Sequence, residues 1–156
     1  QALLSPMLAN VNMVNAGVIA EDRGILVSDG GSASKGTYNT IISVEIQTAD
    51  KTRSIKGTLF GQQPRIVEIK GIEIESAVSA HMLYVTNTDK PGFIGALGNL
   101  LGENNINIGT FHLGRNKVGG DAIALVEVDE PMSEAVLTKI RELPLVTNAV
   151  QLNFDV

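Results

Sequence analysis

The sequence lacks cysteine and tryptophan, and aromatic residues make up only 4% of its 156 residues. Without cysteine the chain can form no disulfide, no thiolate metal site and no cysteine nucleophile. This composition suits a reducing compartment, and we predict a cytoplasmic location. No run approaches the roughly 18 apolar residues of a membrane span, so no membrane partner is expected.

Charge is also scarce, at 19% of the residues compared with about 25% in typical domains. The chain has 12 basic and 17 acidic residues and a formal net charge of −5. Nucleic-acid phosphates attract clustered lysine and arginine, so an acidic chain with few aromatics is a poor candidate for that partner. Hydrophobic residues reach 44%, which is enough to build a folded core.

The length fits one domain or two small ones. The first residues, QALLSPMLANVNMV, have no basic region ahead of their apolar stretch, unlike a signal peptide. The chain begins on Gln1 rather than on methionine. We therefore expect a fragment or a processed product of a longer protein.

The first half predicts a helix followed by an antiparallel meander. Apolar residues recur at a spacing of three to four over residues 6–21, which is typical of a helix. A short apolar run at 25–28 predicts a strand, and 29–36 is a glycine and serine loop. Alternating apolar residues then predict strands at 40–47, 54–60, 65–69 and 72–74.

The second half predicts the order βαββαβ, the ferredoxin-like unit. Its expected strands lie at residues 82–87, 106–113, 121–128 and 146–154, and its expected helices begin at Pro91–Gly92 and Ser133. The expected fold class is α+β: a small helix-plus-antiparallel-sheet domain at 1–78, then a βαββαβ domain at 79–156. The first part has eight acids and seven bases (−1), and the second has nine acids and five bases (−4).

No catalytic or metal-binding pattern is present in the sequence. His81 and His112 have no partner at metal-ligand spacing, and we interpret both as strand histidines. The carboxylates Glu127, Asp129 and Glu130 fit the solvated end of a strand better than a catalytic acid–base pair. No nucleophile elbow or phosphate-binding loop occurs, so we predict binding without catalysis.

The segment 87–92, Asn-Thr-Asp-Lys-Pro-Gly, lies between a predicted strand and a predicted helix. Free N–H groups at the start of a helix can bind a carboxylate. Asp89 could bind an ammonium, and the Asn87 amide can donate and accept hydrogen bonds. Such a set suits a zwitterionic amino acid, but Asp89 is equally well explained as a helix N-cap.

Residues 80–156 resemble an ACT domain. Three features carry this resemblance: the βαββαβ order, Asp89-Lys90-Pro91-Gly92 after the first strand, and NINI at the second strand (residues 105–108). ACT domains are regulatory modules that bind amino acids between two modules packed side by side. The resemblance implies an effector site formed by Asn87, Asp89 and the backbone of Pro91 and Gly92, with Asn107 contributed across the interface.

The first half resembles the intervening domain, or allosteric substrate-binding domain, of the D-3-phosphoglycerate dehydrogenase family. The segments that carry this resemblance are VNMVNA at 11–16, IAEDRGI at 19–25, IKGTLFG at 55–61 and RIVEIKG at 65–71. Many relatives have a proline after the alanine where this chain has Ala16-Gly17. A related domain occurs in iron–sulfur L-serine dehydratases, whose cluster cysteines are absent here.

The family implies an NAD-dependent enzyme that oxidises 3-phosphoglycerate, with its catalytic residues outside these 156. We therefore expect no dehydrogenase activity and no bound cofactor or metal in this chain; NAD would belong to the parent enzyme. L-serine, or a similar small amino acid, would bind as a feedback effector. The expected partners are the missing catalytic domains and further copies of the chain, as a dimer or tetramer.

The resemblance also points to a phosphate-bearing effector on basic side chains of the first half. Arg65 is at a position that is basic in the family, and Lys56, Arg53 and Lys70 are its candidate companions. The loop at 30–34 could form a backbone nest for phosphate, or be a plain turn. Two other functions stay open: an assembly module without ligand, and the regulatory part of an L-serine dehydratase.

Overall fold

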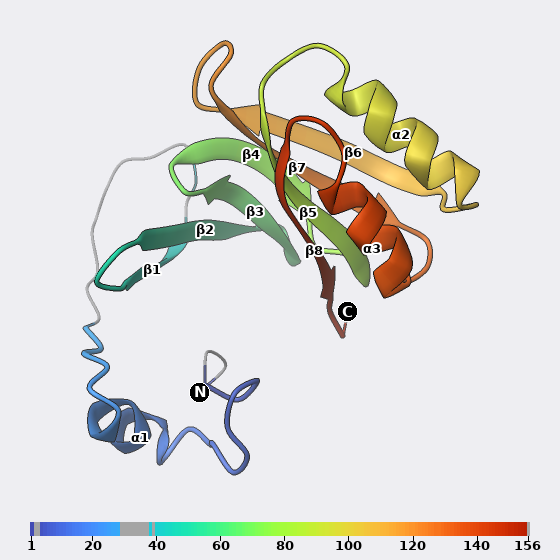
Figure 1. Ribbon diagram of the computed structural model, residues 1–156. Coiled ribbons are helices and arrows are strands. Elements are labelled where there is room, and N and C mark those ends of the chain that lie inside the picture. Colours follow the sequence, from blue (N-terminus) through green and yellow to red (C-terminus); the bar gives the residue numbers. More distant parts are fainter. Residues whose placement is uncertain (2–3, 29–37, 39, 156) are drawn as a thin grey trace. The chain divides into compact units, whose positions relative to one another are not determined.

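The computed structural model describes residues 1, 4–28, 38 and 40–155 (Figure 1). The chain forms two compact units, residues 1–36 and residues 37–156, and each is described by itself. Among the described residues no helix is both long and apolar enough to cross a membrane.

The first unit contains one short helix, α1 (Ala16–Asp22). The helix expected over 6–21 is therefore wrong for its first ten residues. Side chains of two asparagines explain the difference: Asn12 Oδ1 accepts the N–H groups of Val14 and Asn15, and Asn15 Nδ2 donates to the main-chain carbonyl of Asn10. Such side-chain bonds offer the backbone an alternative to helix.

Two other predictions for this part of the chain have different outcomes. Residues 25–28 are not part of a strand, so that expectation is wrong. The glycine and serine loop at 29–36 lies outside the described residues.

The second unit begins with a four-stranded antiparallel meander in the order β1-β2-β3-β4, as the sequence predicts. Its strands are β1 (Ile42–Gln47), β2 (Thr52–Phe60), β3 (Gln63–Ile69) and β4 (Ile72–Ala77). The last hairpin turns at Lys70 and Gly71, whose φ angles of 52° and 75° are typical of a tight two-residue turn.

A second four-stranded sheet follows in the order β6-β7-β5-β8. Its elements, in chain order, are β5 (His81–Thr88), α2 (Phe93–Glu103), β6 (Ile108–Arg115), β7 (Asp121–Val128), α3 (Glu134–Arg141) and β8 (Val146–Asn153). This is the predicted βαββαβ order. Ser133 caps α3 as expected, since its Oγ accepts the N–H of Val136 at 3.4 Å.

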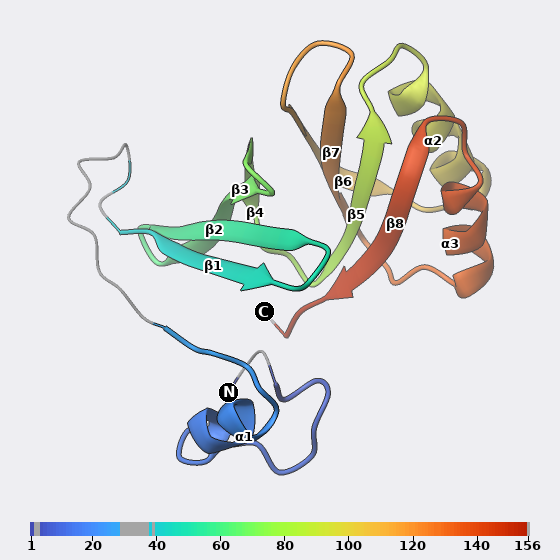
Figure 2. The same ribbon diagram turned by 60° about the vertical axis from the view of Figure 1, so that its left-hand side comes forward.

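The two helices cover one face of this sheet, and the meander packs on the opposite face (Figure 2). On the helix side, Leu97, Leu101 and Ile140 are fully buried against the sheet. On the other side, Ile66 and Ile69 both contact the second sheet, because a register shift between Ile66 and Glu68 interrupts the simple alternation of β3. The fold is therefore α+β. It has three layers: the meander, the second antiparallel sheet and the two helices.

The second sheet and the meander approach closely where β4 crosses β6. A Cβ on Gly114, in β6, would overlap the carbonyl oxygen of Glu73 in β4. Only glycine fits this approach without a shift of the backbone. The domain boundary predicted at 78/79 lies between β4 and β5 in the chain, within the second unit, and it stays a prediction.

Candidate functional site

The end of strand β5, just before the loop to α2, contains an unpartnered buried oxygen. Asn87 is the seventh residue of β5 and is 3% exposed. Its Nδ2 donates to the carbonyl of Thr88 at 3.0 Å, but within the described chain its Oδ1 has no hydrogen-bond partner. A buried acceptor without a donor is destabilising by about 1–3 kcal/mol, so any group that donates to Asn87 Oδ1 would remove this penalty.

The N-terminus of α2 has no side-chain cap. Its N-cap residue is Gly92, in the left-handed region with φ of 102°, and no side chain bonds to the first turn. The alternative that Asp89 acts as the N-cap is therefore wrong. The first N–H groups of an uncapped helix carry partial positive charge and can donate to a carboxylate.

Asp89 bonds instead to the hairpin between β6 and β7. Its Oδ2 accepts from Arg115 Nη1 at 2.8 Å and from the Gly119 N–H at 3.0 Å, while its own N–H donates to the carbonyl of Gly120 at 2.8 Å. The Gly119 N–H, and then the Arg115 guanidinium, hold the pKa of Asp89 below its ordinary value. Asp89 is thus a charged acceptor at neutral pH.

Asn107 lies at the other end of the sheet from Asp89. It directly precedes β6, whereas Arg115, the partner of Asp89, is the last residue of that strand. Eight steps along the strand, at about 3.4 Å each, separate Asn107 from Arg115 by roughly 27 Å. Within one chain the structure therefore groups Asn87, Asp89, Pro91 and Gly92 but leaves Asn107 apart.

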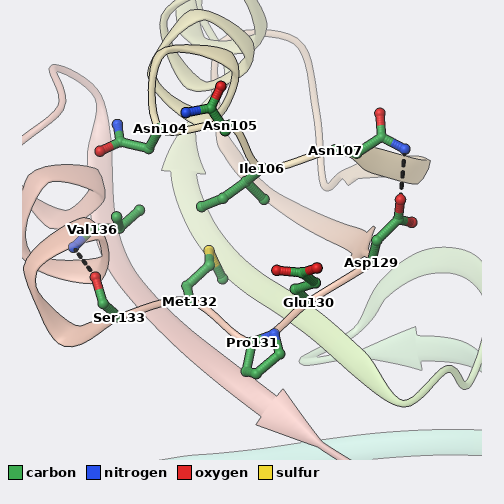
Figure 3. Close-up of a pocket in the computed structure, with 10 residues that line it drawn as sticks. All are labelled: Asn104, Asn105, Ile106, Asn107, Asp129, Glu130, Pro131, Met132, Ser133 and Val136. Carbon is green, nitrogen blue, oxygen red and sulfur yellow. Dashed lines mark hydrogen bonds between the residues drawn. The ribbon is translucent and has the colours of Figure 1, made fainter.

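Asn107 lines a cavity of about 340 Å³ between the α2–β6 and β7–α3 connections (Figure 3). Its Nδ2 donates to Asp129 Oδ2 at 2.8 Å. The other lining residues are Asn104, Asn105, Ile106, Glu130, Pro131, Met132, Ser133 and Val136. With carbonyl and carboxylate oxygens on its walls, the cavity favours hydrogen-bond donors over anions.

The basic residues proposed for a phosphate are interleaved with carboxylates. Lys56 Nζ lies 2.7 Å from Glu68 Oε2, and Arg65 Nη1 lies 3.0 Å from Glu75 Oε1. These ion pairs partly neutralise the positive charge that the sequence suggested.

Beyond these two ion pairs, the basic side chains of the meander have different neighbours. The guanidinium of Arg65 is also 5.3 Å from the Phe60 ring centroid, and the Lys70 ammonium is 5.5 Å from that of Tyr84. Arg53 pairs in register with Ile46 of β1, at the opposite end of β2 from Phe60. The four basic residues therefore do not converge on one point.

The two histidines lie in strands, as the sequence predicts. His81 Nδ1 lies 3.0 Å from Asn153 Oδ1, and His112 pairs in register with Leu125. Across residues 1, 4–28, 38 and 40–155, no three histidines or carboxylates gather as they do around a metal ion. Every strand pairing there is antiparallel, unlike the parallel βαβ unit of the Rossmann dinucleotide-binding fold.

Residues 81–145 match the ACT domain family, which defines the class of the βαββαβ part. Residues 1–70 match the D-3-phosphoglycerate dehydrogenase intervening domain. The chain therefore combines a segment similar to that intervening domain with an ACT domain.

Several similar proteins are D-3-phosphoglycerate dehydrogenases. The D-3-phosphoglycerate dehydrogenase of Bacillus subtilis is 36% identical over 152 residues, which cover 92% of this chain and 29% of the relative. That of Methanocaldococcus jannaschii is 33% identical over 154 residues, covering 98% of this chain and 29% of the relative. The Synechocystis protein is 32% identical, covering 96% and 27%. The chain thus spans less than a third of the length of these relatives.

Sequence reasoning missed Arg115 and Gly119, which hold the Asp89 carboxylate. The available signal was the polar turn at 115–120. This turn joins β6 to β7, and because β7 pairs antiparallel with β5, it lies beside the end of β5. The 26 residues between Arg115 and Asp89 hide their contact from local patterns.

Proposed function

We propose that the chain is the C-terminal regulatory and oligomerisation segment of a D-3-phosphoglycerate dehydrogenase, and that L-serine binds between two copies of its ACT domain. The observation that carries this proposal is the convergence of three unlike groups at the end of β5. They are the unpartnered oxygen of Asn87, the charged carboxylate of Asp89 and the uncapped N-terminus of α2.

Each group matches one part of a small amino acid. The N–H groups that follow Pro91 and Gly92 suit the ligand carboxylate, since the helix dipole favours an anion there. The Asp89 carboxylate suits the ammonium. Asn87 Oδ1 can accept from the ammonium or from a side-chain hydroxyl, which removes the penalty of leaving it unpaired.

The edge position of β6 supports a site shared by two chains. β6 lies at one end of the sheet order. Two β6 strands paired antiparallel about a two-fold axis would bring the start of each strand to the end of the other. Asn107 of the partner subunit would then lie beside Asp89 and Arg115. In this arrangement the two residues meet between subunits, although they are far apart within one chain.

Feedback then follows from linkage. L-serine that binds better to the paired ACT domains favours that arrangement, and it can alter the attached catalytic domains only through this difference in affinity. The NAD-dependent oxidation of 3-phosphoglycerate would take place in those domains. A cytoplasmic location and an anion site at Arg65 stay predictions.

Calorimetric titration of the chain tests the proposal. We expect L-serine to bind with one equivalent per chain and D-serine to bind at least about tenfold more weakly, because the three groups fix three substituents of the α-carbon. Titration with 3-phosphoglycerate tests the separate anion site. If L-serine gives neither heat nor a rise in melting temperature with a folded, dimeric chain, the effector proposal fails. The chain would then be an assembly module without a ligand.

Matched variants locate the site. Asp89→Ala and Asn107→Ala should each weaken L-serine binding at least about tenfold, since each removes one partner of a charged ligand. Asp155→Ala and Asn99→Ala make the same chemical changes at exposed positions, beyond β8 and inside α2, and should bind as the unaltered chain does. Equal effects in the test and control pairs would place the ligand elsewhere.

A further inference from the structure

The carboxylate of Asp89 has one oxygen committed and one oxygen available. Oδ2 receives both the Arg115 guanidinium and the Gly119 N–H. Among the described residues, no group donates to Oδ1. Arg115 therefore binds the carboxylate through one oxygen and does not occupy both, as a bidentate arginine would.

The donors to Oδ2 come from a closed hairpin. The Asn116 N–H donates to the Asp121 carbonyl at 3.0 Å, and the Gly120 N–H donates to the Lys117 carbonyl at 3.0 Å. The Asp89 N–H also bonds to this hairpin, through the carbonyl of Gly120. Asp89 is thus fixed to the β6–β7 hairpin by main chain and side chain together.

Two opposite roles for Arg115 predict opposite changes in the affinity for an amino acid when its side chain is removed. If the guanidinium competed with the ligand ammonium, its removal would strengthen binding of an amino acid. If it orients the carboxylate, its removal would let the Asp89 side chain rotate and would weaken binding. The bonding through Oδ2 alone favours orientation, because it leaves Oδ1 for a second donor.

We propose that Arg115 is a positioning residue of the effector site, holding Asp89 Oδ2 so that Oδ1 accepts the ammonium of the bound amino acid. This inference rests on the proposed function, since it concerns the same ligand. Arg115 acts through Asp89 and makes no contact of its own with the ammonium. The side chain of Arg115 is 52% exposed, so the orientation of Asp89, and not burial of a charge, is its contribution.

A comparison of two ligands tests the inference. 3-Hydroxypropionate has the carboxylate and the side-chain hydroxyl of L-serine but carries a hydrogen in place of the ammonium, so it has nothing to donate to Oδ1. Calorimetry would measure both ligands with the unaltered chain, with Arg115→Gln and Arg115→Lys, and with Lys117→Gln, which removes an equal charge from the same hairpin. Circular dichroism would check that each variant is folded.

We expect Arg115→Gln to weaken L-serine binding about tenfold and to change 3-hydroxypropionate binding by less than about twofold, because only the ammonium depends on Oδ1. Arg115→Lys should recover part of the loss, and Lys117→Gln should show none. An unchanged or tighter affinity of Arg115→Gln for L-serine overturns the inference, as does an equal loss for both ligands. If the unaltered chain binds neither ligand, the proposed function fails as well, and that outcome is distinct from the others.

Discussion

Gly114 offers a sharp test of how the two sheets pack. A Cβ there would overlap the Glu73 carbonyl oxygen and would lie 3.0 Å from Ile72 Cγ2 and 3.1 Å from the Cβ of Ile74. The side chain of Ile72 can rotate away, but the carbonyl belongs to the hydrogen-bonded backbone of β4 and cannot. Gly114→Ala must therefore move β4 away from β6 at the centre of their contact.

Overpacking of this kind is destabilising by about 1–3 kcal/mol. With a urea m-value of about 2 kcal/mol/M, the unfolding midpoint should fall by roughly 0.5–1.5 M. Gly98→Ala is the matched control: its Cβ meets nothing within 4 Å, and it lies inside α2. Alanine is the better helix former, so the control should gain about 0.5–1 kcal/mol.

Urea titration followed by circular dichroism would measure both variants beside the unaltered chain. A Gly114→Ala midpoint equal to that of the unaltered chain would refute the close approach of β4 and β6. A fall in both alanine variants would show that the loss has a cause other than this contact.

Two further predictions concern the core and the acid range. Ile140→Ala empties a fully buried position and should lower the free energy of unfolding by about 2–5 kcal/mol, whereas Ile94→Ala, at a position 54% exposed, should change it by less than about 0.5 kcal/mol; urea unfolding distinguishes them. Because the pKa of Asp89 is depressed in the folded chain, its charge stabilises the fold above the ordinary value of about 3.9, and this contribution is lost as the pH falls through the folded value. The difference in urea midpoint between the unaltered chain and Asp89→Asn should therefore be largest near neutral pH and shrink towards pH 3; a difference that does not change with pH would contradict the ion pair.

Local patterns predicted the second sheet and its helices well, because each pattern agreed with its packing. Leu97 and Leu101 recur at the helical period and are both fully buried, and Ser133 caps the helix it precedes. β7 has the predicted bounds 121–128, and its interior is almost wholly buried. Here propensity, period and cap agree, which makes an element predictable.

The failures arise where distant or side-chain bonds decide. The helix expected from Pro6 does not form because Asn12 and Asn15 bond to their own backbone neighbours. The basic face of the meander is not bare because cross-strand register brings Glu68 opposite Lys56, and that register depends on a shift that no local pattern marks. Cross-strand neighbours of this kind follow from pairing and not from sequence distance.

The effector loop falls between these cases. Its position and its residue types were predictable from the sequence, but the direction in which Asp89 bonds was not. A capping role and a ligand role both fitted the spacing. The bonds of Asp89 to the hairpin that follows β6 exclude the capping role, and the ligand role stays a prediction.

The separation of Asp89 from Asn107 has a consequence for mixtures of defective chains. If each ligand is held by the loop of one subunit and by Asn107 of the partner subunit, each chain contributes two different halves to two different sites. Asp89→Ala and Asn107→Ala chains would then complement one another: a mixed dimer has one position with both halves intact and one with both halves damaged. An equal, freely exchanging mixture should recover about a quarter of the sites, although neither variant binds by itself.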